Sequence, residues 1–276
     1  MRIFLTGGTG FIGSHFLNVA HAAGHEVVAL RRPGSIPPIP LTSEPQWIEG
    51  SLADDHRDSL AECDALVHLA AAGVNPSDDD LEDLFLINVH QSLSLWTQAV
   101  HCGIRKLVLC GSCFEYGASG QRYEYIPITA PLEPTNAYGC SKAAATFAAY
   151  GLCLTREIKC SVLRPFHVFG DGEAPHRFWA SLKAAALSGQ DFPMTEGQQV
   201  RDFVPVKDVA TSFIDELTRN DQEPGKLKLR NIGTGAPKYL SDFAQYWWKY
   251  WSASGKLFIG KESYRPNEVM RYIPEV

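Results

Sequence analysis

Tyr138 and Lys142 lie four residues apart in an alanine-rich stretch, residues 138–156, that is predicted to be helical. Side chains at this spacing share one face of a helix, so the phenol and the ammonium would be neighbours. A free tyrosine has a pKa of about 10, too high for easy proton exchange near neutral pH. We expect the Lys142 ammonium to lower that pKa and make Tyr138 an acid–base group. The alternative is a surface pair without chemistry.

Ser112 supplies a second reactive group. It follows a predicted buried strand, residues 105–110, and its hydroxyl could donate a hydrogen bond to a substrate oxygen and hold it against Tyr138. The candidate catalytic residues are therefore Ser112, Tyr138 and Lys142.

The elements that must position these groups begin at the N-terminus. An apolar strand (residues 2–6) leads through a glycine-rich loop into a helix (residues 14–23), which Gly24 ends, and then into a second buried strand (residues 26–30). Strand, loop, helix and strand in this order form one right-handed crossover unit. A GxGxxG loop in this setting predicts a dinucleotide site, whereas a glycine turn without a ligand is the alternative.

The glycines of the loop have separate expected roles. We expect Gly8 to adopt backbone angles closed to other residues, Gly10 to admit a pyrophosphate, and Gly13 to let the helix pack closely on the strand. The diphosphate would lie on free N–H groups at the N-terminus of the helix. The loop residues predicted to contact the cofactor are Gly7, Gly10, Phe11, Ile12 and Gly13.

The second strand ends in Arg31 and Arg32, where a fold that selects NAD usually has an acidic residue. An arginine would instead pair with the 2′-phosphate of NADP. The sequence therefore favours NADP(H), with NAD as the alternative cofactor. The competing interpretation is two solvated arginines beside a loop rich in proline and glycine, residues 33–38.

Further cofactor contacts are expected where other strands end. Ser51 and Leu52 would lie beside adenine, and the small residues after the fourth strand would leave room for a ribose or the nicotinamide, unless they only pack a helix on the sheet. Lys142 could also bind the nicotinamide ribose. The remaining predicted cofactor contacts are Leu69, Ala70, Ala71, Tyr138, Pro165, His167 and Val168.

The wider pattern predicts an α/β fold, a doubly wound parallel sheet with a smaller C-terminal lobe. The expected domains are residues 1–166 with about 203–234 for the dinucleotide, and residues 167–202 and 235–276 for the substrate. A seventh strand is expected to return to the main sheet. The remaining predicted strands are residues 46–49, 65–69, 159–164, 201–206 and 227–232, and the remaining helices are residues 58–63, 81–101, 177–188, 208–220 and the aromatic-rich 240–251, which we interpret as a packing element.

Composition excludes several classes of protein. The chain has 276 residues and a net charge of −6, which argues against a nucleic-acid partner. No apolar run approaches the roughly 20 residues of a membrane span, and the N-terminus lacks a signal pattern, so a cytoplasmic location is expected. Seven cysteines fit reduced thiols, and Cys110 and Cys113 lack a second pair for a metal site, so no metal is predicted.

Motifs spread over the chain resemble the extended short-chain dehydrogenase/reductases, in the nucleotide-sugar epimerase/dehydratase branch. They are residues 6–13, residues 68–71, Ser112 four residues before Tyr116, residues 138–142, residues 164–165, residues 201–204 and residues 231–235. The resemblance implies a Rossmann domain that holds NAD(P), a small lobe that holds a nucleoside-diphosphate sugar, and a Ser–Tyr–Lys catalytic set. It also implies a homodimer formed through the two long helices, residues 81–101 and 138–156.

The reaction is narrowed by the residues that follow Ser112. Dehydratases of the family carry an Asp-Glu pair there, whereas this chain has Cys113 and Phe114, with Glu115 one place too late. Dehydration is therefore discounted. Epimerase-reductases of the GDP-fucose type carry a cysteine where Phe114 stands, so that double chemistry is not expected either.

The remaining reactions are 4-epimerisation and 4-keto reduction. Arg31 and Arg32 favour an NADPH-dependent 4-ketoreductase, and residues 170–173, 197–209 and 264–270 resemble CDP-abequose and CDP-paratose synthases. We therefore expect reduction of the 4-keto group of a nucleoside-diphosphate sugar. An NAD-dependent 4-epimerase is the alternative, and a non-catalytic NADPH-binding sensor is a third hypothesis.

Arg201 is the candidate for the substrate diphosphate, because a guanidinium matches phosphate geometry. The alternative is an ion pair with Asp202 or Asp208. The other candidate substrate-binding residues are Ser112, Cys113, His176 and Arg265.

Overall fold

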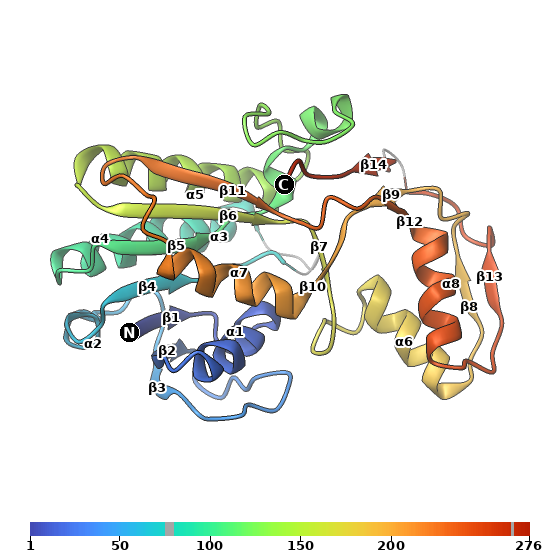
Figure 1. Cartoon of the computed structure of the whole chain (residues 1–276), viewed down its shortest axis with the longest axis horizontal. Coiled ribbons are helices and arrows are strands. Elements are labelled where there is room, and N and C mark those ends of the chain that lie inside the picture. The colour runs from blue at the N-terminus through green and yellow to red at the C-terminus, as the bar shows by residue number, and fades with distance from the viewer. Residues whose placement is uncertain (75–79, 266–267) are drawn as a thin grey trace.

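The computed structural model describes residues 1–74, 80–265 and 268–276. Its centre is a seven-stranded sheet in the order β11-β6-β5-β4-β1-β2-β3 (Figure 1). All neighbouring strands of this sheet run parallel. The strands are β1 (Arg2–Thr6), β2 (Glu26–Arg31), β3 (Gln46–Glu49), β4 (Ala65–His68), β5 (Lys106–Cys110), β6 (Lys159–Pro165) and β11 (Leu227–Ile232). The predicted doubly wound sheet is confirmed, and residues 227–232 return to it as the seventh strand.

Helices cover both faces of the sheet because side chains alternate along each buried strand. Ile3 and Leu5 of β1 pack on one face with α1 (Phe11–Ala22) and α7 (Val206–Thr218). Phe4 points to the other face, into a core formed with α2 (Arg57–Ala61), α4 (Ser92–His101) and α5 (Ala137–Thr155). Figure 1 shows these two helical layers on opposite sides of the strands.

The predicted helix over residues 81–101 is not regular. It is built from α3 (Leu81–Phe85), a π-helical segment (Leu86–Gln91) and α4. Asn88 of the π segment accepts a hydrogen bond from Ala72 N (2.8 Å) and donates to Ala72 O (3.1 Å). A period of 3.6 residues does not reveal such a widened turn, which here holds the loop that follows β4.

The C-terminal lobe lies to one side of the sheet and contains α6 (Phe178–Ser188) and α8 (Leu240–Tyr250) (Figure 1). Short strands complete it and connect it to the sheet. They are β7 (His167–Phe169), β8 (Phe192–Met194), β9 (Val200–Arg201), β10 (Phe203–Pro205), β12 (Lys238–Tyr239), β13 (Leu257–Ile259) and β14 (Arg271–Tyr272).

The single strand predicted over residues 201–206 is wrong, because Asp202 separates β9 from β10. Its buried carboxylate accepts hydrogen bonds from Thr234 N (2.9 Å) and Gly235 N (2.6 Å), just after β11. These hydrogen bonds connect the turn between β9 and β10 to the segment that follows β11 of the main sheet.

Helix α8 packs through one face only. Phe243 stacks on Phe203 with ring centres 3.8 Å apart, and Trp247 contacts Phe169, so the predicted packing role is confirmed for this face. Tyr246 and Tyr250 point outward and are exposed.

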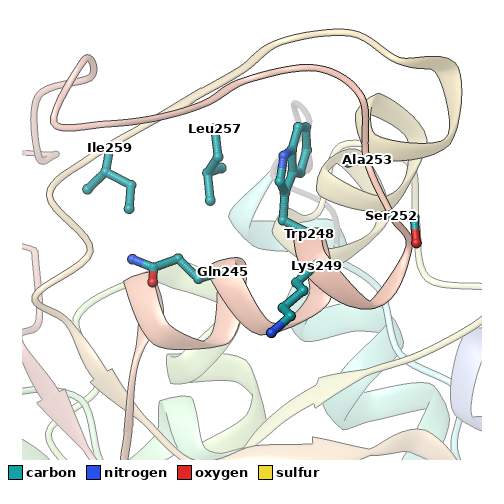
Figure 2. Close-up of a pocket in the computed structure, with 7 residues that line it drawn as sticks. All are labelled: Gln245, Trp248, Lys249, Ser252, Ala253, Leu257 and Ile259. Carbon is teal, nitrogen blue, oxygen red and sulfur yellow. The ribbon is translucent and has the colours of Figure 1, made fainter.

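An open pocket of about 550 Å³ lies beside α8 and β13. Figure 2 shows that Trp248, Gln245 and Lys249 line it from the helix, with Leu257 and Ile259 opposite. Its lining includes none of the predicted site residues.

A buried ion pair lies at the carboxyl edge of the sheet. Arg164 at the end of β6 donates from Nε to Glu115 Oε2 (2.9 Å), and both side chains are at most 1% exposed. The same guanidinium donates to the hydroxyl of Tyr116 (3.0 Å), which in turn donates to Asn231 (2.7 Å). This network joins β6, β11 and the loop after β5.

Arg164→Met should destabilise the protein by about 3–5 kcal/mol, because it leaves the Glu115 carboxylate buried without its cation. Urea unfolding measures the change. The control Arg122→Met removes an exposed pair with Glu133 and should alter stability little, since water screens both charges. Equal effects of the two substitutions would contradict this assignment.

Candidate active site at the carboxyl edge of the sheet

The predicted catalytic residues lie at one edge of the sheet. Parallel strands place all their carboxyl ends on the same side, so the segments after β1, β2, β3, β4, β5 and β6 share this edge. Ser112 follows β5, and α5 carries Tyr138 and Lys142 in its first turns.

Ser112 is held by a short 3₁₀ turn, Cys113–Glu115. Its Oγ accepts a hydrogen bond from Phe114 N (3.2 Å), while Glu115 Oε1 accepts one from Ser112 N (2.8 Å). This reciprocal capping leaves the hydroxyl proton of Ser112 available for donation. Ser112 is buried, so a group that receives this proton has little competition from water.

Tyr138 lies in the first turn of α5, where Asn136 caps the helix by accepting from Gly139 N (2.7 Å). The ring of Tyr138 packs edge-on against Phe114, with centres 6.2 Å apart. Burial raises the pKa of Tyr138 above its ordinary value, and a hydrogen bond with the Ser112 side chain opposes this rise. The phenol and the serine hydroxyl therefore face each other.

The expectation that Lys142 lowers the pKa of Tyr138 is wrong in this arrangement. The buried ammonium of Lys142 donates to the carbonyl oxygen of Cys110 (2.6 Å) at the end of β5, and burial dominates the pKa of the phenol. Helical spacing predicts that the two side chains share a face, but it does not show which oxygen the ammonium will contact.

The N-terminus of α1 fits a diphosphate. Gly10 caps this helix without a side-chain hydrogen bond, and the first turn, which lies wholly in the described chain, carries no acidic residue. Its N–H groups and the positive end of the helix dipole are therefore available to an anion. A Cβ at Gly13 would lie 2.0 Å from Gly7 O, so only glycine allows this close packing. The helix begins at Phe11, three residues before the predicted start.

The glycine with unusual backbone angles is Gly7, not Gly8 as predicted. Gly7 has a φ of +76°, and a Cβ there would lie 2.6 Å from the backbone nitrogen of Ala70. The turn after β1 thus packs directly on the loop after β4, where Ala70 N also donates to Thr6 Oγ1 (3.3 Å). Leu69 and Ala71 flank this contact at the same edge.

Arg31 already has partners at the end of β2. Its Nη2 donates to Glu49 Oε1 (3.1 Å), and its guanidinium lies over the ring of Trp47, 5.0 Å from the centre. Arg32 is exposed. A carboxylate beside Arg31 would repel a 2′-phosphate, which weakens the argument for NADP that rested on Arg31.

The other predicted cofactor residues take varied positions. Ser51 after β3 is engaged locally with Asp54 (Oγ to Oδ1, 3.0 Å), and Leu52 is buried. Pro165 ends β6, while His167 and Val168 belong to β7.

On the lobe side of this edge, Arg201 is buried and forms an ion pair with Glu268 (3.0 Å). Neither expected alternative partner, Asp202 or Asp208, takes this place. His176 and Arg265, the weaker candidates, are exposed.

Sequence reasoning missed Arg177, which stands next to His176. Its Nη2 donates to Val74 O (2.7 Å), so it links the lobe to the loop that follows β4. The positive charges of Arg177 and Arg201 both act on His167, whose pKa burial lowers well below its usual value. Burial and the two positive charges therefore keep the His167 imidazole neutral. No pattern in the sequence indicates the contact between Arg177 and Val74, because the two residues lie 103 positions apart.

Cys110 and Cys113, which form a CxxC sequence, have thiols that burial keeps protonated. Burial raises the pKa of Cys110 to about 11 and that of Cys113 to about 12. Because the thiolate is the reactive form, neither residue is suited to redox or nucleophilic chemistry.

Comparison with known proteins identifies the family of this chain. The sequence profile of the NAD dependent epimerase/dehydratase family matches residues 3–233. The chain belongs to this family. Relatives in the family include a UDP-glucose 4-epimerase from Lacticaseibacillus casei, 31% identical over 258 residues that cover 85% of this chain and 76% of that protein. Another is a dTDP-6-deoxy-L-talose 4-dehydrogenase (NAD(+)) from Aggregatibacter actinomycetemcomitans, 27% identical and covering 87% of each chain.

Among solved structures, a similar fold is found in MoeE5 in complex with UDP-glucuronic acid and NAD. It is 28% identical, with a TM-score of 0.85 over 100% of this chain and 90% of that chain. These proteins give no support to the predicted preference for NADP. None of the helices in the described part of the chain has the length and apolar character needed to cross a bilayer.

Glu49→Gln should raise the affinity for NADP relative to NAD by about tenfold, since it frees the Arg31 guanidinium for a 2′-phosphate. Titration of both dinucleotides measures this ratio. Glu26→Gln, at the opposite end of β2, is the control and should leave the ratio unchanged. Tighter binding of NADP than NAD by the unmodified protein would contradict the role assigned to Glu49.

Proposed function

We propose that this protein is an NAD-dependent 4-epimerase of a nucleoside-diphosphate sugar. The observation that carries the proposal is the facing pair Ser112 and Tyr138, placed at the same sheet edge as the uncapped N-terminus of α1. The UDP-glucose 4-epimerase relatives and the NAD-bound MoeE5 complex support it. It replaces the expected NADPH-dependent 4-ketoreductase, which was inferred from Arg31, Arg32 and the resemblance of residues 170–173, 197–209 and 264–270 to CDP-abequose and CDP-paratose synthases.

The bound dinucleotide would supply the acceptor and later the donor of hydride at C4 of the sugar. Ser112 donates a hydrogen bond to the C4 oxygen and fixes its position. Tyr138 takes the proton of the C4 hydroxyl as the C–H bond breaks, and returns it when hydride is restored to the other face. Lys142 donates to the Cys110 carbonyl oxygen, and from there it would bind the nicotinamide ribose of the dinucleotide. The cycle produces no net oxidation.

Dehydration finds no support at Glu115, the acidic residue nearest to Ser112. One carboxylate oxygen accepts from Ser112 N, and the other accepts from Thr146 (2.8 Å) and Arg164. A carboxylate engaged on both oxygens is poorly placed to carry a proton from the sugar to a leaving hydroxyl.

The sugar nucleotide would bind between the sheet edge and the lobe. Arg201 and Arg177 both act on His167 and would share the two charges of the diphosphate. Arg201 would then exchange its partner Glu268 for a phosphate oxygen. In this proposal residues 1–166 with about 203–234 hold the dinucleotide, and residues 167–202 and 235–276 hold the sugar nucleotide, with Cys113 lining the site between them. His176 and Arg265 stay candidate substrate contacts in this proposal, and both are exposed.

A second candidate is an NAD-dependent 4-oxidoreductase that releases its product after one hydride transfer. The relative described as a dTDP-6-deoxy-L-talose 4-dehydrogenase (NAD(+)), 27% identical, favours it. The same Ser112 and Tyr138 would serve either reaction.

A homodimer is also part of the proposal. Phe147, Tyr150 and Leu154 form an exposed apolar stripe on α5 at helical spacing, and Leu81 and Phe85 of the neighbouring α3 are exposed as well. Such a stripe is typical of a surface that another helix covers. The cytoplasmic location stays a prediction.

Tyr138→Phe should lower conversion of UDP-glucose to UDP-galactose by about 10²–10⁴-fold, because the proton carrier is lost while the ring remains. Chromatography of the nucleotide sugars measures the rate with NAD⁺ present. The exposed tyrosine of α8, changed in Tyr246→Phe, is the control and should keep full activity. A Tyr138→Phe protein as fast as the unmodified one would overturn the proposal.

The pH dependence follows from the raised pKa of Tyr138. A general base that is still protonated at neutral pH makes sugar oxidation faster as pH rises, by up to about tenfold per unit. Because the Ser112 hydrogen bond lowers this pKa, Ser112→Ala should move the rise to higher pH. Single-turnover formation of NADH from UDP-glucose measures both effects. A flat profile from pH 6 to 9, or a shift to lower pH, would contradict the assignment.

A further inference from the structure

We propose that Tyr272 is a positioning residue, whose hydroxyl holds the turn that carries Ser112. This inference rests on the proposed function, since it assigns Tyr272 a part in the chemistry of Ser112. Tyr272 lies 160 positions after Ser112 in the chain, in β14, and the GxGxxG and YxxxK patterns do not involve it.

The contact is direct and buried. The Tyr272 hydroxyl donates to the carbonyl oxygen of Cys113 (2.8 Å), and the residue is only 5% exposed. The same carbonyl accepts from Tyr116 N (3.0 Å), the bond that closes the 3₁₀ turn. The peptide between Cys113 and Phe114 is thus held at its carbonyl from two sides. Its N–H, on Phe114, donates to Ser112 Oγ (3.2 Å), so both bonds limit how the serine hydroxyl can point.

The backbone around Tyr272 is itself fastened to the loop that follows the turn. Ile126 N donates to Ile273 O (2.7 Å), and Glu275 N donates to Ile126 O (2.9 Å). Asn231 Nδ2 donates to Glu275 O (3.3 Å), which ties this segment to the end of β11. Residues 271–276 therefore form a strap over the Ser112 loop.

Two neighbours fix the ring of Tyr272. Its face lies against Phe166 with ring centres 5.8 Å apart, and His167 meets it edge-on at 6.4 Å. A Cβ at Gly120 would lie 2.4 Å from the Tyr272 ring, so the phenol reaches Cys113 only because residue 120 has no side chain. The absence of a side chain at residue 120 and the hydroxyl of Tyr272 serve the same contact.

A role in packing alone would need only the ring. Phenylalanine would keep the contacts with Phe166 and His167 and would remove the bond to the Cys113 carbonyl. Catalytic groups must be held within about 0.5 Å of their productive positions, so the loss should appear in the chemical step.

A double-mutant cycle with Tyr272→Phe and Ser112→Ala tests the proposal, with UDP-glucose as the substrate. Tyr272→Phe should lower kcat by about tenfold and leave KM within about twofold. On the Ser112→Ala background the same substitution should change kcat by less than about twofold, because the group that it positions is gone. Tyr125→Phe, which changes an exposed tyrosine near the strap, should have no effect on either background.

Equal losses on both backgrounds would show a general packing role and overturn the proposal, as would an unchanged kcat. Gly120→Ala, which pushes the ring away while keeping the hydroxyl, should reproduce the loss seen in Tyr272→Phe. Full activity of Gly120→Ala would also count against the assignment.

Hydrogen exchange separates this inference from the proposed function, because it needs no substrate. The amide of Tyr116 should exchange at least about fivefold faster in Tyr272→Phe, while the capped amide of Gly139 should be unchanged. If the unmodified protein leaves UDP-glucose unconverted, the proposed function fails. Hydrogen exchange alone then tests whether Tyr272 holds the turn after Ser112. Unchanged exchange at Tyr116 would then overturn the positioning role.

Discussion

The buried carboxylate of Glu115 is the interaction on which the site depends. Through its two oxygens it contacts the Ser112 backbone, Thr146 on α5 and Arg164 on β6. One side chain thus joins the loop that carries the serine to the helix that carries Tyr138 and Lys142. A buried ion pair contributes little net stability compared with apolar packing, but breaking it leaves a charge in a medium of low polarity. We interpret the pair as a device that fixes one arrangement of the site.

Local patterns were sufficient for most of the fold. Apolar runs predicted the strands of the main sheet, and glycine positions predicted the turn after β1, because both signals come from neighbouring residues. Ser112 and Tyr138 could be paired from sequence, since Ser112 comes shortly after a strand and Tyr138 lies in the first turn of a helix. The choice of Gly8 over Gly7 was wrong because the close approach is made by the Leu69–Ala70 backbone, more than sixty residues away.

The features that sequence reasoning missed are contacts between distant segments. Arg177 reaches Val74, Tyr272 reaches Cys113, and Arg201 finds Glu268 instead of a neighbouring aspartate. Arg31 shows most clearly how a contact with a distant segment changes a prediction made from sequence. An arginine at the end of β2 suggests a 2′-phosphate, but the carboxylate of Glu49 on the adjacent strand pairs with Arg31 and would repel that phosphate. No periodicity in the sequence gives this information.

The fate of the C4 hydrogen tests the central claim most directly. UDP-glucose carrying deuterium at C4 would be incubated with the protein and NAD⁺, and the UDP-galactose formed would be analysed by mass spectrometry and NMR. Removal and return of hydride within one bound complex predict that the deuterium remains at C4 of the product. Deuterium found in released NADH, or product that has lost the label, would contradict epimerisation at this site.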